Sequence, residues 1–366
     1  MYLPAVLLLA LAVGTGHRTP LTPSVGGSQP HQTSTMWPWL RQQATPTAVA
    51  SAAATEPTAP PMTATPTPAT PRPDETPSNG GDASAPALSM AASATPAAPP
   101  PPPTPAPPPP PSVLAGNQIV VFYGSPISAQ LGILGAFTPE DAAARVRDEA
   151  AIYDSINGDR GAVPALDVIY EMVQSEPTAN GLYLRYLDDA TVQTYLAAAH
   201  AGNVQLILDL QIGRGDPLAE VRGLEPFLRD PLVHVAIDPE YAVGPEGIPL
   251  ETPGTITGAQ INDVQDYLAG IAAQDNLPPK MLIIHQYLDG TVIDGDAVRD
   301  TRGVNLVLNM DAFGDLTRKV EKYRMFSARS YAKHKAFNIF LKHDDQVMSE
   351  TDIEAIDPQP DVIFYQ

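Results

Sequence analysis

From about residue 115 onward, short apolar segments alternate with longer segments in which apolar residues recur at helical intervals. The apolar segments are continuous hydrophobic runs such as VQLILDL and KMLIIHQ, which is typical of parallel strands buried on both faces. We predict eight strands, at residues 119–123, 165–170, 204–210, 233–237, 281–285, 304–309, 337–341 and 362–365.

Capping signals mark the segments between these strands as helices. Thr138 precedes a proline and two acidic residues, and Thr257 has the capping-box spacing to Gln260. We predict further helices at residues 189–199, 218–228 and 316–332, and a short one that starts at Ser349 and Asp352. The alternation of strands and helices predicts an α/β protein of the (β/α)8 TIM-barrel class. The alternative, an open doubly wound sheet, usually has a glycine-rich phosphate turn after its first strand, and GSPISAQLGILG does not match one.

The first third of the chain has a different composition. Residues 1–16 contain an apolar run without a preceding Lys or Arg, too short to span a bilayer, and we interpret them as a signal peptide. Residues 17–114 are rich in Pro, Ala, Thr and Ser, so we predict a disordered linker. The barrel domain then comprises residues 115–366. We expect the protein to be secreted or displayed on the cell surface, with no membrane span other than an uncleaved signal anchor.

The charge balance excludes one class of partner. The chain has 41 acidic and 21 basic residues, a formal net charge of −20, and no cysteine. Almost all of the charged residues belong to the predicted barrel. Such an acidic surface repels phosphate backbones, so nucleic acid is not an expected partner. The absence of cysteine excludes disulfides and thiolate chemistry. We expect a monomer.

Polar side chains follow nearly every predicted strand. In this fold the reacting groups come from the carboxyl ends of several strands. The residues at those ends are Tyr123, Tyr170, Glu171, Asp209, Gln211, Asp238, Glu240, His285, Gln286, Asn309, Asp311, Lys342, His343, Tyr365 and Gln366. Buried polar groups are costly without partners, so their convergence at one opening predicts a functional site.

Asp238-Pro239-Glu240 is the most informative of these segments. Two positions apart on a strand, both side chains would face the same way, with their Cα atoms about 6.5 Å apart. Mutual repulsion and loss of water would then raise the pKa of one carboxyl group, as a general acid requires. In the alternative interpretation, Asp238 caps the following loop and Glu240 points to solvent.

These residues carry a resemblance to known proteins. The chain resembles glycoside-hydrolase-type barrels, in which an acidic residue after strand four commonly acts as the acid/base. Asp238-x-Glu240 is similar to the end of the chitinase motif Asp-x-x-Asp-x-Asp-x-Glu, although Val233 and Ala236 stand where two earlier acids would be. More closely, LILDLQIGR, VAIDPEY, LIIHQ and PQPDVIFYQ look like an uncharacterised group of exported bacterial barrel proteins, a resemblance that supports the fold and implies no activity.

We therefore expect an exported hydrolase that cleaves glycosidic bonds in a polysaccharide or cell-wall glycan with paired carboxylates. Glu240 would be the acid/base and Asp238 would tune it, while Asp209 or Asp311 would be the nucleophile or the base that activates water. The residues expected to contact substrate are His285, Gln286, Tyr123, Glu171, Gln211, Asn309, Lys342 and Tyr365.

Two alternatives remain open at this point. Asp209, Asp238, His285 and Asp311 are suitable ligand types for a metal, but their spacing is not diagnostic, and we expect neither metal nor cofactor. A non-catalytic barrel that binds a glycan or wall polymer is the rival from another class. Both tryptophans, Trp37 and Trp39, precede the barrel, so sugar-stacking surfaces would have to come from Tyr or Phe.

Overall fold

The computed structural model describes residues 108–331 and 333–366. The predicted signal peptide and most of the predicted linker lie outside the described residues. The packed region begins slightly before residue 115, because Leu114 is buried and packs with Ile119 inside the barrel. No helix in the described ranges has the length and apolar character needed to cross a bilayer.

Eight parallel strands form a closed ring, which confirms the predicted barrel and rules out the open sheet. They are β1 (Asn117–Ser125), β3 (Gly161–Val173), β5 (Gln205–Leu210), β6 (Val233–Ile237), β8 (Lys280–Gln286), β10 (Val304–Met310), β11 (His334–Ile339) and β12 (Val362–Tyr365). Pairing runs around the ring in this order, and β1 closes it by pairing with both β3 and β12. Two short antiparallel strands, β2 (Ser128–Gly132) and β4 (Leu184–Tyr186), extend β1 and β3.

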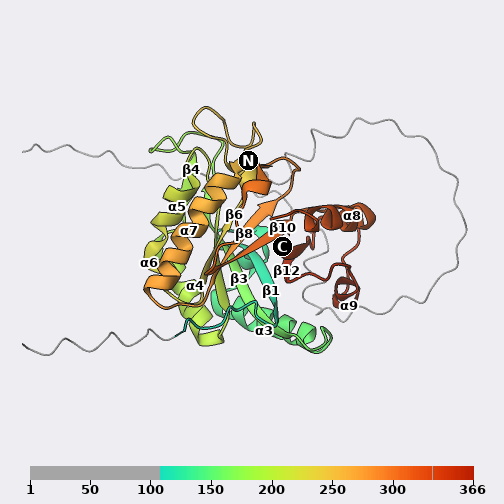
Figure 1. The fold of residues 1–366 in the computed structure, drawn as a ribbon. Helices are drawn as coiled ribbons and strands as arrows, with labels where there is room; N and C mark the ends of the chain where they lie inside the picture. The colour runs from blue at the N-terminus through green and yellow to red at the C-terminus, as the bar shows by residue number, and fades with distance from the viewer. Residues whose placement is uncertain (1–107, 332) are drawn as a thin grey trace, which may run out of the picture. The chain divides into compact units, whose positions relative to one another are not determined.

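The described residues contain seven α-helices, which lie outside the ring of strands (Figure 1). They are α3 (Pro139–Asp154), α4 (Asp189–Gly202), α5 (Pro217–Gly223), α6 (Glu225–Leu228), α7 (Gly258–Gln274), α8 (Leu316–Ser327) and α9 (Glu350–Glu354). The predicted caps are confirmed: the Thr138 hydroxyl accepts from Asp141 N, Thr257 and Gln260 form a reciprocal capping box, and Ser349 caps α9.

The helical layer departs from the predicted pattern in three connections. The helix expected at 218–228 is divided into α5 and α6, with Pro226 in the first turn of α6, where its missing N–H is tolerated. The helix expected to reach residue 332 ends at Ser327, and the residues after it bond instead to the connection after β8, through Arg329 to Asp289 and Ser330 to Asp296. Between β8 and β10 there is no α-helix. That connection holds the short strand β9 (Val292–Ile293), which pairs with β7 (Ile256–Thr257), and the 3-10 helix η3 (Gly295–Ala297).

Alternation along each strand divides the core into two layers. In β1, Ile119 and Val121 pack inside the barrel, whereas Val120 and Phe122 pack against the helices. The interior cluster contains one or two apolar side chains from each strand of the ring and fills the lower part of the barrel. Polar residues that follow these positions on the same strand face therefore lie above this apolar layer, at the carboxyl ends of the strands.

A buried acidic pair lies between two of the outer helices. Glu149 of α3 and Glu350 of α9 are both fully buried. Burial first, and the charge of Glu350 second, raise the pKa of Glu149 from its ordinary value of 4.5 to about 8. The folded protein therefore keeps a proton on Glu149 at neutral pH that the unfolded chain has released.

This difference predicts how stability depends on pH. Because the folded state binds one proton more between pH 4.5 and about 8, the free energy of unfolding falls as pH rises through that window. Glu149→Gln removes the titrating group and should raise the free energy of unfolding at pH 8 by roughly 4 kcal/mol. Urea unfolding of the full chain across this pH range measures the effect. Glu140→Gln, at an exposed position of the same helix, should show the wild-type decrease of the free energy of unfolding with pH. An equally steep decrease in Glu149→Gln would contradict the prediction.

Candidate active site

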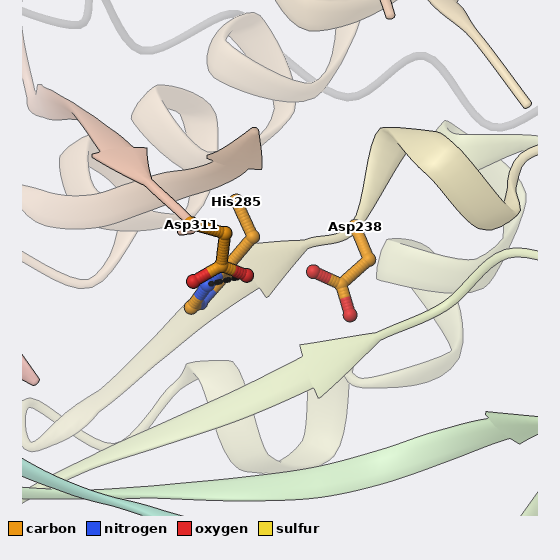
Figure 2. Close-up of side chains that lie close together, drawn as sticks. All are labelled: Asp238, His285 and Asp311. Atoms are coloured by element: carbon orange, nitrogen blue, oxygen red, sulfur yellow. Dashed lines mark ion pairs between the residues drawn. The ribbon is translucent and has the colours of Figure 1, made fainter. Parts of the chain in front are cut away.

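Acidic side chains from four strands of the ring meet around one histidine of a fifth strand, above the apolar layer. Asp167 of β3, Asp209 of β5, Asp238 and Glu240 after β6, and His285 of β8 are all buried. Asp311, which follows β10, keeps 18% of its side chain exposed. Figure 2 shows Asp311 beside His285, with Asp238 at the end of β6 directing its carboxylate toward them. The site predicted at the carboxyl ends of the strands is thus a real convergence of side chains.

His285 holds the centre of this cluster. Its Nε2 lies 3.6 Å from Asp167 Oδ2, and its Nδ1 lies 3.5 Å from Asp311 Oδ2. Burial alone lowers the pKa of this imidazole, but the interactions with Asp167 and Asp311 outweigh burial and raise the pKa well above 6.5. The direction of this shift favours the protonated imidazole, whose charge would balance the carboxylates on both sides of its ring.

The surrounding carboxyl groups respond in the opposite way to burial. Burial, together with the charge of Asp167, raises the pKa of Asp209 to about 7. Burial and then the charge of Asp311 raise the pKa of Glu240 to about 7, and burial raises the pKa of Asp238 well above 3.8. A single imidazolium cannot neutralise so many carboxylates, so some of these groups carry protons at neutral pH.

Glu240 does not extend the strand as we predicted. β6 ends at Ile237, and Pro239–Tyr241 form the 3-10 helix η2, so the expected strand spacing between Asp238 and Glu240 is wrong. Pro239 has no N–H to continue the ladder, and the chain turns at this residue. The turn carries Glu240 to the end of β8, where Tyr287 N donates to Glu240 Oε1. The alternative in which Glu240 points to solvent is also wrong, because Glu240 is only 7% exposed.

Several acceptor atoms in the cluster have no hydrogen-bond partner among the described residues. They are both carboxylate oxygens of Asp209, both of Asp167, and Oε2 of Glu240. Such groups are expensive to bury unless something in the functional state uses them. Since Oε1 of Glu240 is held by the main chain, Oε2 is the oxygen of this carboxyl group that lacks a partner.

The same residues contain the one group in the described ranges with metal-site spacing. Single ligand atoms of Asp238, His285 and Asp311 lie within 4.8 Å of one another. Both ring nitrogens of His285 face carboxylates, however, and its pKa is raised, so this side chain fits a charge partner better than a neutral metal ligand. A cation would first have to replace the imidazole proton.

The remaining predicted residues divide into two sets. Tyr123 and Asn309 belong to the cluster: the Tyr123 ring lies 5.8 Å from that of His285, and Asn309 Nδ2 lies 2.8 Å from His285 Nδ1. Gln211 lies in the same end of the barrel, but its Oε1 accepts from Val173 N. Glu171 is buried next to Glu220, and burial raises its pKa well above 4.5.

Three predicted substrate contacts lie elsewhere. Tyr365 packs in the outer layer, and its hydroxyl lies 2.7 Å from that of Tyr153. Gln286 is buried, and its amide bonds to the Tyr331 hydroxyl and to Leu288 O. Lys342 is exposed and donates to Ala129 O. Tyr365 and Gln286 were chosen because they lie at the ends of strands, but in the structure each follows a residue that faces the axis, so alternation turns it outward.

The sequence interpretation missed residues on both sides of the histidine. Asp167 lies in the middle of β3, not at its end, because β3 is the longest strand of the ring. The sequence feature that could have identified Asp167 is an acidic residue inside the apolar run ALDVIY, on the same strand face as Ala165 and Ile169. Asn338 accepts from Asn309 at 3.1 Å. Tyr287 and Phe313 follow β8 and β10 and stack with their ring centroids 5.8 Å apart.

Comparisons with known proteins add little to the geometry. No family model matches the chain, and no curated protein matches it. Among solved structures, it is similar to a tri-modular GH5 (subfamily 4) endo-β-1,4-glucanase from Bacillus licheniformis, with 9% identity, a TM-score of 0.40 and 69% of this chain covered. The chain spans 55% of that protein. A GH5-4 broad-specificity endoglucanase from an uncultured bacterium shows 8% identity and a TM-score of 0.33, with 62% of this chain and 77% of that one covered.

The charge state of His285 can be tested directly. Asp167→Asn removes one of the two carboxylates that favour the protonated imidazole, and should lower the pKa of His285. NMR titration of the histidine ring signals in the full chain measures this value. Asp230→Asn removes a carboxylate beside His200 in the outer layer and should leave the His285 signal unchanged. A wild-type His285 that titrates near 6.5 would show that the imidazole is not the charge partner described above.

Proposed function

We propose that the mouth of the barrel hydrolyses a glycosidic bond, with Glu240 as general acid and Asp311 as the second carboxylate. The observation that carries this proposal is the arrangement of Glu240: one oxygen is fixed by Tyr287 N and the other is unpartnered. The charge of Asp311 contributes to the raised pKa of Glu240, which indicates that the two groups are close. Glycoside hydrolysis requires two carboxyl groups, one that donates a proton and one that acts as nucleophile or base.

The roles of the two carboxyl groups follow from their surroundings. Glu240 Oε2 would donate its proton to the leaving oxygen as the bond from the anomeric carbon breaks. Asp311, the most exposed acid of the cluster, would attack that carbon or remove a proton from the attacking water. His285 faces Asp311 at 3.5 Å and would fix its orientation, and the charge of Glu240 contributes to the raised pKa of the neighbouring Asp238.

The rim of the mouth carries two aromatic rings. Tyr287 and Phe313 are stacked at an interplanar angle of 19° and are both partly exposed, on the connections that follow β8 and β10. Lys322 Nζ lies 4.3 Å from the centroid of the Tyr287 ring, so the faces of this ring are in contact with the protein and the exposed ring edges would meet a ligand. We propose an exported enzyme acting on a polysaccharide or wall glycan, as the composition of residues 1–114 suggests.

A non-catalytic glycan binder is the competing function. A binder needs aromatic surfaces and hydrogen-bonding groups, but it does not need several buried carboxyl groups whose pKa values are raised. The cost of burying these acids favours catalysis, because a raised pKa supplies the proton that bond cleavage consumes.

Replacing the proposed general acid, Glu240, should distinguish glycoside hydrolysis from glycan binding. Glu240→Gln keeps the shape of the side chain but has no proton to donate, so turnover should fall by about 10²- to 10⁴-fold. Release of reducing ends from a panel of polysaccharides, with the full chain, measures it. Glu246→Gln, at an exposed position in the same connection, should retain wild-type turnover. If Glu240→Gln cleaves at the wild-type rate, the assignment of the acid is wrong; if the wild type binds a glycan and cleaves none, the binder is right.

The pH dependence provides a second test. The proposed acid must be protonated, and its pKa is raised to about 7, so kcat/KM should fall as pH rises through about 7. A pH–rate profile on a polysaccharide that the panel shows to be cleaved measures this descending limb. The residual activity of Glu240→Asp, which retains an acid with a shorter reach, should keep a descending limb, whereas that of Glu240→Gln should lose it. A flat profile between pH 6 and 9 would exclude Glu240 as the acid.

A further inference from the structure

A separate cavity of about 240 Å³ opens at the carboxyl ends of β1 and β3. Its walls come from the turn after β1, from β3 and β4, and from the first turn of α4, through Ile127, Ile169, Tyr170, Arg185, Tyr186 and Thr191. None of these residues belongs to the acidic cluster around His285. The volume is below that of most drug-sized sites, so the cavity suits a ligand about as large as a single ring.

The cavity lies next to the proposed active site. Ile169 follows Asp167 by two positions on β3, which places their Cα atoms about 6.5 Å apart on the same strand face. Ile169 also pairs in register with Asp209 of β5. A chain of linked rings that passes over the acidic cluster would therefore reach the cavity within about one ring.

Exposed apolar side chains form two walls of the cavity. Ile127 is 48% exposed and Tyr186 is 37% exposed, which are large values for such side chains. The rings of Tyr170 and Tyr186 lie 6.0 Å apart at an interplanar angle of 58°. The Tyr186 hydroxyl donates to Glu220 Oε2 at 3.1 Å, so this ring is held in place although it is exposed.

Unused hydrogen-bonding groups stand beside these apolar walls. Within 108–331 and 333–366, the Arg185 guanidinium and the Tyr170 hydroxyl make no hydrogen bond or ion pair. Arg185 alone offers five N–H donors. Rigid aromatic faces together with free donors match a sugar ring, which has an apolar C–H face and hydroxyl groups at its edge.

We propose that this cavity binds one neutral sugar ring of the glycan whose bond is cleaved at the His285 cluster. The inference rests on the proposed function for the class of ligand. The ring is neutral because Arg185 and Asp188, which carry opposite charges, both line the cavity and Glu220 is bonded to Tyr186, so no net positive charge is left to hold an anionic sugar. The cavity thus determines which units of a polymer can lie beside the cleaved bond.

Binding can be measured without cleavage in the full chain carrying Glu240→Gln. The probes are neutral gluco-, manno-, xylo- and galacto-oligosaccharides, titrated by calorimetry. At least one should bind, and adding Tyr186→Ala should weaken its binding about five- to tenfold through loss of the aromatic face. Arg185→Ala should weaken it about fivefold. Tyr186→Phe, which keeps the ring and loses only the bond to Glu220, should bind within about twofold of the parent.

The controls separate this inference from the catalytic proposal. Ile293→Ala changes an exposed residue of β9 that does not line the cavity, and should leave binding unchanged. Thermal unfolding of Tyr186→Ala checks that the variant is folded. The cavity is not a sugar site if no probe binds, or if folded Tyr186→Ala and Arg185→Ala bind as tightly as the parent. If Tyr186 governs sugar binding but wild-type protein cleaves no glycan, the cavity assignment holds and the hydrolase proposal fails.

Discussion

The mouth of this barrel depends on one buried ion-pair arrangement, the imidazolium of His285 between Asp167 and Asp311. Closing eight strands into a ring directs alternate side chains of every strand toward one axis. Acidic residues at the same level along that axis therefore lie close together. One positive ring cannot balance the charges of Asp209, Asp238 and Glu240 as well. Protons bound to some of these carboxyl groups remove the remaining negative charge. The cluster therefore holds acidic protons near neutral pH.

Packing and electrostatics are coupled at this level of the barrel. The ring of Phe364 meets that of His285 edge to face at 5.1 Å, and the apolar interior cluster continues below it. Water cannot approach the cluster from that side, which keeps the local dielectric low and the interactions between charges strong. The same apolar residues that stabilise the barrel therefore raise the pKa values above them, and a larger or smaller residue at Phe364 would alter both properties together.

The sequence predicted the fold far better than the details of the site. Continuous apolar runs and capping residues such as Thr257 are local signals, and the strands and caps they indicated are present. The direction in which each side chain points was harder to predict from the sequence, because it depends on the position at which each strand enters the barrel. Tyr365 was assigned to the mouth although it faces the helices, and Asp167 was overlooked although it faces the axis. Glu240 was placed correctly at the mouth for the wrong reason, since a turn, not a strand, carries it there.

The proposal of catalysis, as opposed to simple recognition, rests on what the buried acids can do. Recognition of a neutral glycan is served by exposed rings and free donors, and the cavity beside Tyr170 and Tyr186 has both without any buried carboxylate pair. At the His285 cluster the reverse holds: aromatic surface is confined to the rim, and the centre consists of ionisable groups that are costly to bury. Under the proposed function, one of these two neighbouring surfaces would bind the ligand and the other would act on it. This separation is expected where binding energy outside the reacting bond positions the substrate for proton transfer.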